Sequence, residues 1–159
     1  MEKKLILIRH AEAEEGALSD KERALTQRGI RQAYLLSEWM QQQHFLPALI
    51  VHSSARRCRE TAQLLAERLN IAALQEEERL YNASMRQIVE VLEQMSGPVE
   101  SLALVGHNPY LSYFAEWVTG EPLGSLSPAS AVALSLPVDD WTMLSGQMAT
   151  LLGRFDAVY

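Results

Sequence analysis

The chain has 159 residues, of which 48% are hydrophobic and 21% charged, values that suit one soluble globular domain over residues 1–159. Its net charge of −6 argues against a general nucleic-acid binder, because such domains are usually basic. One cysteine excludes an intrachain disulfide, and no apolar run approaches the length of a membrane span, so we expect a cytoplasmic protein without a membrane partner.

The chain opens with a strand, a loop and a helix. Residues 5–8 form a continuous apolar run of strand length, which is typical of a strand covered on both faces. The polar and acidic stretch 11–25 predicts a loop. Apolar residues then recur at helical spacing over residues 27–42, and Thr26 is placed to cap the amino end of that helix.

A second strand and helix follow the same plan. The apolar run at 48–51 predicts the strand, and helical spacing continues over residues 56–69. Ser53 or Ser54 is placed to cap this helix, and Asn70 suits its carboxyl end.

The middle of the chain is harder to interpret. Residues 71–83 carry no clear period and predict no element. Ser84 is placed to cap a helix over residues 85–95, which Gly97-Pro98 should end. The apolar run at 102–105 predicts a third buried strand.

Asn108 and Pro109 suit the start of another helix, with the asparagine as cap and the proline in the first turn. Residues 131–136 and 148–152 then predict two strands joined by a turn. Alternating strands and helices favour an α/β fold with three layers. We expect a mainly parallel open sheet with helices on both faces and a late antiparallel hairpin at the edge.

Each of the three apolar runs ends in polar chemistry. Arg9-His10 follows the first run, His52 to Arg57 follows the second, and Gly106-His107 follows the third. Right-handed crossovers place the carboxyl ends of parallel strands on one side, where ligands of such sheets bind. The sequence therefore predicts a crevice for an anion such as phosphate.

Three arginines begin the helix after the second strand, namely Arg56, Arg57 and Arg59. They are unfavourable there, because a helix amino end already carries partial positive charge, and a bound anion would remove the conflict. The alternative is a solvated group in which Arg56 pairs with Glu60.

His10 and His107 suit covalent chemistry on that anion. A neutral imidazole nitrogen can attack phosphorus, and neighbouring arginines stabilise the charge on the transferred group. Acidic ligands are absent from two of the three strand ends, so we expect no metal, with a zinc site as the alternative. We also expect no cofactor.

Four motifs, taken in order, resemble those of the histidine phosphatase (phosphoglycerate mutase-like) superfamily. They are Arg9-His10-Ala11, Leu25-Thr26 with Gly29 and Gln32-Ala33, Ser53 to Ala62, and Gly106-His107. The family motif is usually Arg-His-Gly, and an alanine at the third position is seen in its small SixA-type branch. The resemblance covers nearly the whole chain.

The resemblance implies a role for each matching residue. His10 matches the nucleophile that becomes phosphohistidine, and Arg9 matches the first phosphate-binding arginine. Arg57, four residues after Ser53, matches the second arginine, whereas Arg56 does not fit that register. His107 matches the second histidine, which binds the phosphoryl group and shares in proton handling.

Many family members carry a glutamate acid in an insertion between the second and third strands, and that region is short here. Residues 76–78 are acidic but are typical of a solvated run, so Glu12, as a substrate-binding residue, or Glu14 is considered instead. Phosphohistidine needs less acid catalysis than an alkyl phosphate, since its imidazole leaves easily once protonated.

We therefore expect a phosphatase acting on a phosphohistidine-containing signalling or phosphotransfer protein. The alternatives are a small-metabolite phosphomonoesterase of the same superfamily and a non-catalytic phosphate-binding regulatory module. Because the nearby arginines disfavour the imidazolium form of His10, we expect activity to persist below neutral pH. Cys58 should face the core as an inert thiol.

Overall fold

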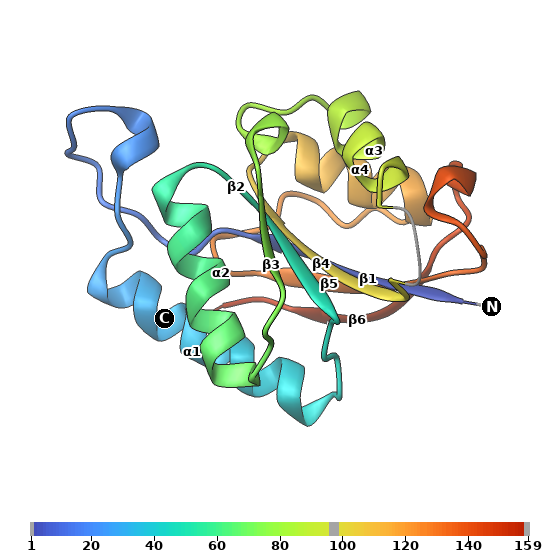
Figure 1. Cartoon of the computed structure of the whole chain (residues 1–159), viewed down its shortest axis with the longest axis horizontal. Coiled ribbons are helices and arrows are strands. Elements are labelled where there is room, and N and C mark those ends of the chain that lie inside the picture. The colour runs from blue at the N-terminus through green and yellow to red at the C-terminus, as the bar shows by residue number, and fades with distance from the viewer. Residues whose placement is uncertain (1, 96–98, 158–159) are drawn as a thin grey trace.

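A mixed sheet runs through the centre of the computed structural model, which describes residues 2–95 and 99–157 (Figure 1). Its described strands lie in the order β3-β2-β4-β1-β5-β6. They are β1 (Lys3–Arg9), β2 (Leu49–Ser53), β3 (Leu74–Glu77), β4 (Ser101–Gly106), β5 (Ala131–Leu136) and β6 (Thr150–Phe155).

The pairing confirms the predicted sheet. β1, β2, β3 and β4 are mutually parallel, with β4 between β1 and β2. β5 runs antiparallel to β1, and β6 antiparallel to β5, so the late pair of strands lies at one edge. The carboxyl ends of β1, β2 and β4 therefore point the same way and lie side by side.

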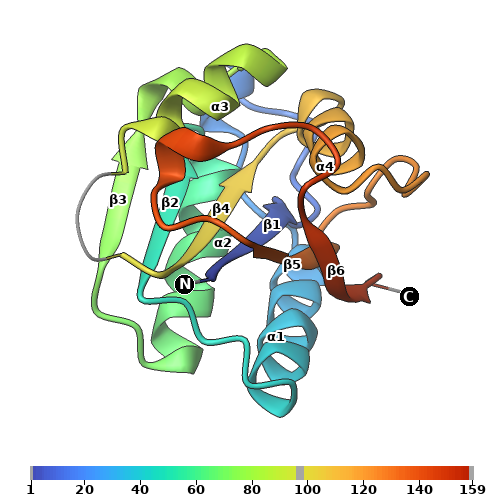
Figure 2. The same ribbon diagram turned by 90° about the vertical axis from the view of Figure 1, so that its right-hand side faces the viewer.

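Helices cover both faces of this sheet, as Figures 1 and 2 show. α1 (Gln27–Gln42) and α2 (Arg56–Leu69) pack together on one face, and α3 (Met85–Glu93) and α4 (Tyr110–Thr119) lie on the other. The predicted three-layer α/β architecture is confirmed.

Alternation along β1 divides the core between the two faces. Leu5 and Leu7 join the cluster under α3 and α4, and Ile6 and Ile8 join the cluster under α1 and α2. Each of these four side chains is at most 4% exposed. Burial of one such side chain stabilises the fold by about 1.5–3 kcal/mol, so the continuous apolar run fixes β1 in the centre of the sheet.

Two helix starts differ from the prediction. Ala55 caps α2 without a side-chain hydrogen bond, because Ser53 Oγ instead accepts from the Ala55 amide and contacts His107. α4 begins at Tyr110 with Pro109 at its cap position, since the Asn108 side chain is engaged elsewhere in the fold. The prediction of a serine cap and of an asparagine cap at these two helices was therefore wrong.

The other predicted caps are confirmed. The Thr26 side chain accepts from the Gly29 amide, and Ser84 forms a capping box with Gln87. Asn70 ends α2 in the left-handed conformation, with φ of 61°. α3 ends at Glu93, while the predicted helix end at residues 97–98 lies outside the described residues.

Two further differences concern strands. β3, over Leu74–Glu77, was not predicted, because an edge strand with mostly exposed polar residues shows no apolar run. β6 occupies Thr150–Phe155 rather than 148–152. The segment before it contains a short 3₁₀ helix with the buried Trp141, so β5 and β6 are not joined by a tight turn.

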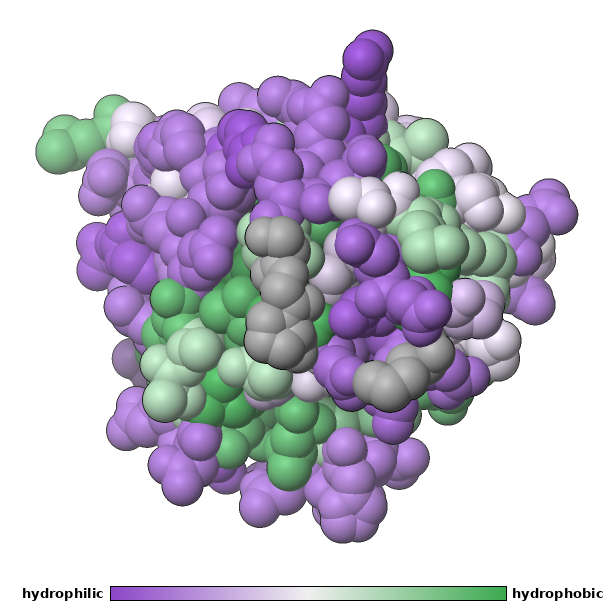
Figure 3. All heavy atoms as spheres, turned by 45° about the vertical axis from the view of Figure 1, so that its right-hand side comes forward, coloured by the Kyte–Doolittle hydropathy of each residue, from purple (hydrophilic) through white to green (hydrophobic). Residues whose placement is uncertain are grey.

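The surface seen in Figure 3 is mainly hydrophilic, with hydrophobic residues gathered in patches between polar ones. In the part of the chain that the structure describes, no helix combines the length and the apolar character needed to cross a membrane.

Candidate active site

The structure brings His10, His107 and the start of α2 together at the carboxyl ends of the parallel strands. Arg9 lies beside Gly106 in the β1–β4 pairing, and the His10 amide donates to the Gly106 carbonyl at 3.1 Å. This register sets the two histidine rings 5.4 Å apart between centroids, with 59° between their planes. A group bound between the rings would contact both.

One hydrogen bond fixes the tautomer of His10, whose side chain is buried. Its Nδ1 lies 2.8 Å from the Ala11 carbonyl oxygen, which can only accept, so Nδ1 carries the proton. In the neutral ring, Nε2 then holds the free lone pair. The carbonyl is itself held in place, because the Ala11 amide donates to Thr61 Oγ1 at 3.1 Å.

The hydrogen bonds of His107 assign the opposite tautomer. Arg57 Nη2 lies 3.4 Å from His107 Nδ1, and a guanidinium only donates, so Nδ1 is unprotonated. His107 Nε2 then carries the proton and donates to Ser53 Oγ at 2.9 Å. Cys58 Sγ lies 3.5 Å from the same nitrogen, and burial raises the pKa of this thiol to about 12, so the thiol stays protonated.

Burial keeps both histidines uncharged. It is the main reason that the pKa of His10 falls to about 3. The hydrogen bond to Ala11 opposes this shift, while the neighbouring His107, Arg57 and Arg9 act in the same direction as burial. Burial, followed by the charge of Arg57, lowers the pKa of His107 to about 4. At pH 7 the ring of His10 is therefore neutral and can act as a nucleophile.

Arg57 and Arg56 differ sharply although they are adjacent. The Arg57 side chain is 7% exposed and points to His107, while the Arg56 side chain is 43% exposed and pairs with Glu60 at 3.2 Å. Arg57 is thus the arginine that α2 contributes to the histidine pair, and Arg56 forms the solvated i,i+4 pair considered from the sequence.

Arg9 reaches the site from the end of β1 and is held by the loop after α4. Arg9 Nη1 donates to the Leu126 carbonyl at 2.9 Å, and Asn108 Nδ2 donates to the same oxygen at 2.7 Å. Asn108 Oδ1 in turn accepts from Ser112 Oγ at 2.7 Å. Asn108, which was predicted as a helix cap, therefore helps to position Arg9.

Two arginines in one buried site repel each other. Burial and the charge of Arg57 lower the pKa of Arg9. The Nε atoms of both arginines are buried without a hydrogen-bond partner among the described residues. Excess positive charge with unused donors fits an anion far better than a cation.

Asp20 is the residue of this region that the sequence analysis missed. It lies on a short 3₁₀ helix over Asp20–Glu22, in the loop between β1 and α1, and its Oδ2 is 3.1 Å from Arg57 Nη2. Tyr81 donates its hydroxyl to the same oxygen at 2.8 Å. The pKa of Asp20 is held well below its usual range, mainly by the hydrogen bond from Tyr81 and then by those from Arg23 and Arg57.

Glu12, the other predicted substrate-binding residue, is directed toward α1. Its Oε2 accepts from Thr26 Oγ1 at 2.8 Å, and its Oε1 lies 3.6 Å from Arg28. Its backbone explains the glycine of the second motif, because a Cβ at Gly29 would come 2.1 Å from the Glu12 carbonyl oxygen. The structure therefore places the Glu12 carboxylate at the start of α1, apart from the histidine pair.

The sequence pattern of the histidine phosphatase superfamily (branch 1) matches residues 5–95 of this chain. The chain belongs to this superfamily. The Mycobacterium tuberculosis protein Rv1276c is similar to it, with 30% identity over 158 residues that cover 92% of this chain and 97% of the relative. The Mycobacterium leprae protein ML1117 is 28% identical over 145 residues, covering 85% and 87%.

Solved structures of superfamily members share the fold. A candidate phosphohistidine phosphatase SixA from Nakamurella multipartitia superposes with a TM-score of 0.84 at 22% identity, covering 100% of this chain and 98% of that one. The protein histidine phosphatase SixA complexed with tungstate gives 0.83 at 19% identity, covering 97% of each chain. The mycobacterial glucosyl-3-phosphoglycerate phosphatase Rv2419c gives 0.65 at 18% identity, covering 96% and 98%.

Membership of the superfamily supports a hydrolase acting on phosphate esters and confirms the resemblance that the four motifs indicated. The SixA neighbours show that the fold is shared.

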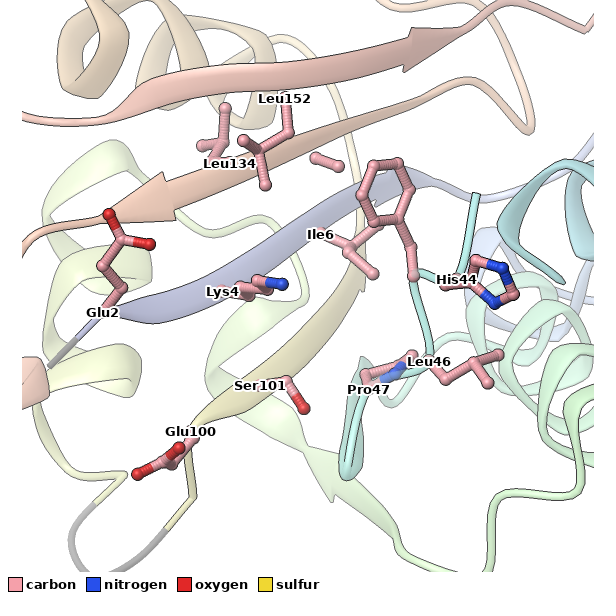
Figure 4. A pocket seen from close by; sticks show the side chains of 12 residues that line it. Glu2, Lys4, Ile6, His44, Leu46, Pro47, Glu100, Ser101, Leu134 and Leu152 are labelled. Carbon is pink, nitrogen blue, oxygen red and sulfur yellow. The ribbon is translucent and has the colours of Figure 1, made fainter. Parts of the chain in front are cut away.

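A hollow of about 290 Å³ lies at the opposite end of the sheet, near the amino ends of β1 and β4 (Figure 4). Ile6, Leu134 and Leu152 line its apolar side, and the exposed residues Glu2 and Glu100 lie at its edge. In parallel sheets, ligands bind beyond the carboxyl ends of the strands, where the two histidines lie. The hollow is therefore distinct from the candidate active site.

Proposed function

We propose that this protein is a phosphatase that works through a phosphohistidine intermediate on His10. The observation that carries the proposal is the hydrogen bond from His10 Nδ1–H to the Ala11 carbonyl, since it leaves Nε2 as the unprotonated nitrogen. Arg9 and Arg57 lie beside that ring and would donate to the oxygens of the phosphoryl group. His107 would join them once the negative charge of the bound group favours a proton on its Nδ1, which is unprotonated in the resting site.

The reaction proceeds in two displacements. In the first, the lone pair of His10 Nε2 attacks phosphorus, and the bond from phosphorus to the leaving group breaks with its electron pair on that group, which takes up a proton. In the second, water attacks the phosphorylated His10, the P–N bond breaks, and inorganic phosphate leaves. The arginines stabilise the charge on the equatorial oxygens in both steps.

We propose phosphohistidine on a signalling or phosphotransfer protein as the substrate. The Asp20 carboxyl has a pKa far below neutrality and is a poor proton donor, while the Glu12 carboxylate is held at α1. A site with this shortage of acids suits a leaving imidazole, which accepts a proton readily. The tungstate complex of the SixA neighbour supports an oxyanion as the bound group.

The test is turnover by the whole chain, with a metal chelator present, on a phosphohistidine protein, a phosphoramidate and several alkyl phosphate monoesters. We expect fast release of phosphate from the first two and little from the esters. Fast turnover of an ester would instead support a small-metabolite phosphatase, such as the structural neighbour Rv2419c, a glucosyl-3-phosphoglycerate phosphatase.

The variant His10→Ala separates an enzyme from a phosphate-binding module. We expect turnover to fall by at least about 10³-fold, because the nucleophile is removed. Phosphate release that continues at the wild-type rate would overturn the proposed role of His10.

A further inference from the structure

Asp20 occupies the donors of Arg57 that face the histidine pair. Arg57 Nη1 donates to the Asp20 backbone carbonyl at 2.8 Å, and Arg57 Nη2 donates to Asp20 Oδ2 at 3.1 Å. The same Nη2 also contacts His107 Nδ1 at 3.4 Å. A phosphoryl oxygen that binds this end of the guanidinium therefore competes with the carboxylate of Asp20.

We propose that the Asp20 carboxylate takes the place of the substrate phosphoryl group on Arg57 in the resting site and leaves it when substrate binds. Asp20 is then a positioning residue, which acts through Arg57 and does not touch the reacting atoms. The inference rests on the proposed function, because it requires Arg57 to bind a phosphoryl group.

The chemistry of the two anions supports this exchange. A carboxylate and a phosphoryl group both accept charge-assisted hydrogen bonds from a guanidinium, so a phosphoryl oxygen can take the place of Asp20 Oδ2 on Arg57 Nη2. A phosphoryl group brings more negative charge than the single charge of Asp20, and Arg9 lies close enough to Arg57 for the two charges to interact. The stronger anion therefore displaces the weaker one.

The loop that carries Asp20 is exposed at its outer part and held at its base. It projects beyond the end of the sheet between β1 and α1 (Figure 1), and the Asp20 side chain is 52% exposed, against 7% for Arg57. The bridge between Ala13 and Leu25 closes the base of the loop, while Leu18 at its outer part is fully exposed. Contacts near the tip can thus be exchanged while the base stays in place.

Tyr81 and Arg23 give the displaced carboxylate a second set of partners. Tyr81 donates to Asp20 Oδ2 at 2.8 Å, and Arg23 Nη1 donates to Asp20 Oδ1 at 3.0 Å. Because these contacts do not involve Arg57, Asp20 keeps partners when the phosphoryl group takes the arginine. After hydrolysis, its return to Arg57 would help inorganic phosphate to leave.

The test compares wild type with Asp20→Asn, which keeps the shape and an acceptor oxygen but removes the charge. Glu22→Gln is the matched control, because it removes one charge from an exposed residue of the same 3₁₀ turn. The readouts are the Kd of inorganic phosphate by calorimetry, its inhibition constant, and kcat and KM measured separately.

We expect Asp20→Asn to bind phosphate about tenfold more tightly, the size of one lost charge-assisted competitor. KM should fall and product inhibition should strengthen, with kcat changed by less than about threefold. Glu22→Gln should match wild type. A residue that only orients Arg57 would give the opposite result, with weaker phosphate binding and a lower kcat.

Suppose that the wild-type protein binds phosphate and turns over substrate, but Asp20→Asn binds phosphate equally or more weakly. That result would overturn this inference and leave the proposed function standing. A wild type that neither binds phosphate nor turns over any phosphoryl substrate would overturn the proposed function and this inference with it. The variant Asp20→Ala repeats the comparison without the acceptor oxygen, so an effect of the amide itself would be recognised.

Discussion

The two ends of the parallel sheet treat their charged residues differently. At the carboxyl ends of β1 and β4 the buried His10 lies near the buried Arg57. At the amino ends Glu2 and Glu100 stay exposed, and the buried Lys3 donates to the Val99 carbonyl at 3.1 Å. The hollow of Figure 4 is at the amino end. A cluster of buried side chains with shifted pKa values, rather than a hollow or a single buried charge, therefore distinguishes the candidate active site, because burial lowers the pKa of both His10 and His107.

The largest effect expected from this contrast is the loss of Arg57. Arg57→Ala should lower kcat by about 10²–10³-fold, since it removes a buried donor to the charge that develops on the phosphoryl oxygens. Arg56→Ala is the matched control and should stay within about twofold, because Arg56 is half exposed and pairs with Glu60. Steady-state kinetics on the substrate that wild type prefers measures both, and equal losses in the two variants would contradict the assignment.

An intermediate effect is expected in the dependence of the free energy of unfolding on pH. The ordinary pKa of histidine is 6.5, whereas the folded values are about 3 for His10 and about 4 for His107. In the pH range between these values the unfolded chain binds more protons than the folded chain. The free energy of unfolding should therefore fall as the pH drops below about 6.5, by up to about 1.4 kcal/mol per pH unit for each histidine. The low pKa of Asp20 adds a loss only below its usual value of 3.8.

Urea unfolding at pH 7, 6 and 5 measures this slope. A variant with both His10→Gln and His107→Gln should show a shallower fall than wild type across the same range. An equal slope in the two proteins would show that the histidines are not the groups that titrate.

The smallest effect is expected at the amino end of the sheet. Leu46→Ser changes a half-exposed residue of the hollow there, so stability should change by no more than about 0.5 kcal/mol. We expect kcat to stay within about twofold of wild type, as measured by the same assay. A loss above tenfold in a protein that is still folded would mean that the amino end takes part in the reaction.

The residues of the two ends also show what could be predicted from sequence. The apolar runs gave the central strands, since burial on both faces demands them, and the motif register selected Arg57 over Arg56. Asp20 could not be found in this way, because it lies 37 residues from Arg57 in a polar loop, and only the folded chain brings the two together. Its one sequence signal was an acidic loop directly after Arg9-His10.

The cap of α2 could not be predicted for a related reason. Ser53 has the residue type of a helix cap, but its hydroxyl is used by His107, which comes from a different strand. Local rules assign a side chain to its nearest backbone groups, and at this site the tertiary contact has replaced that assignment.

The most direct test is to trap the intermediate. Wild-type protein mixed with the preferred substrate is quenched within milliseconds at alkaline pH, where phosphohistidine persists, and the phosphorylated residue is identified by mass spectrometry and phosphorus NMR. Our account predicts a phosphoryl group on His10, attached at Nε2, because Nδ1 donates to the Ala11 carbonyl. A phosphoryl group on another residue, or full turnover with no covalent intermediate, would contradict it.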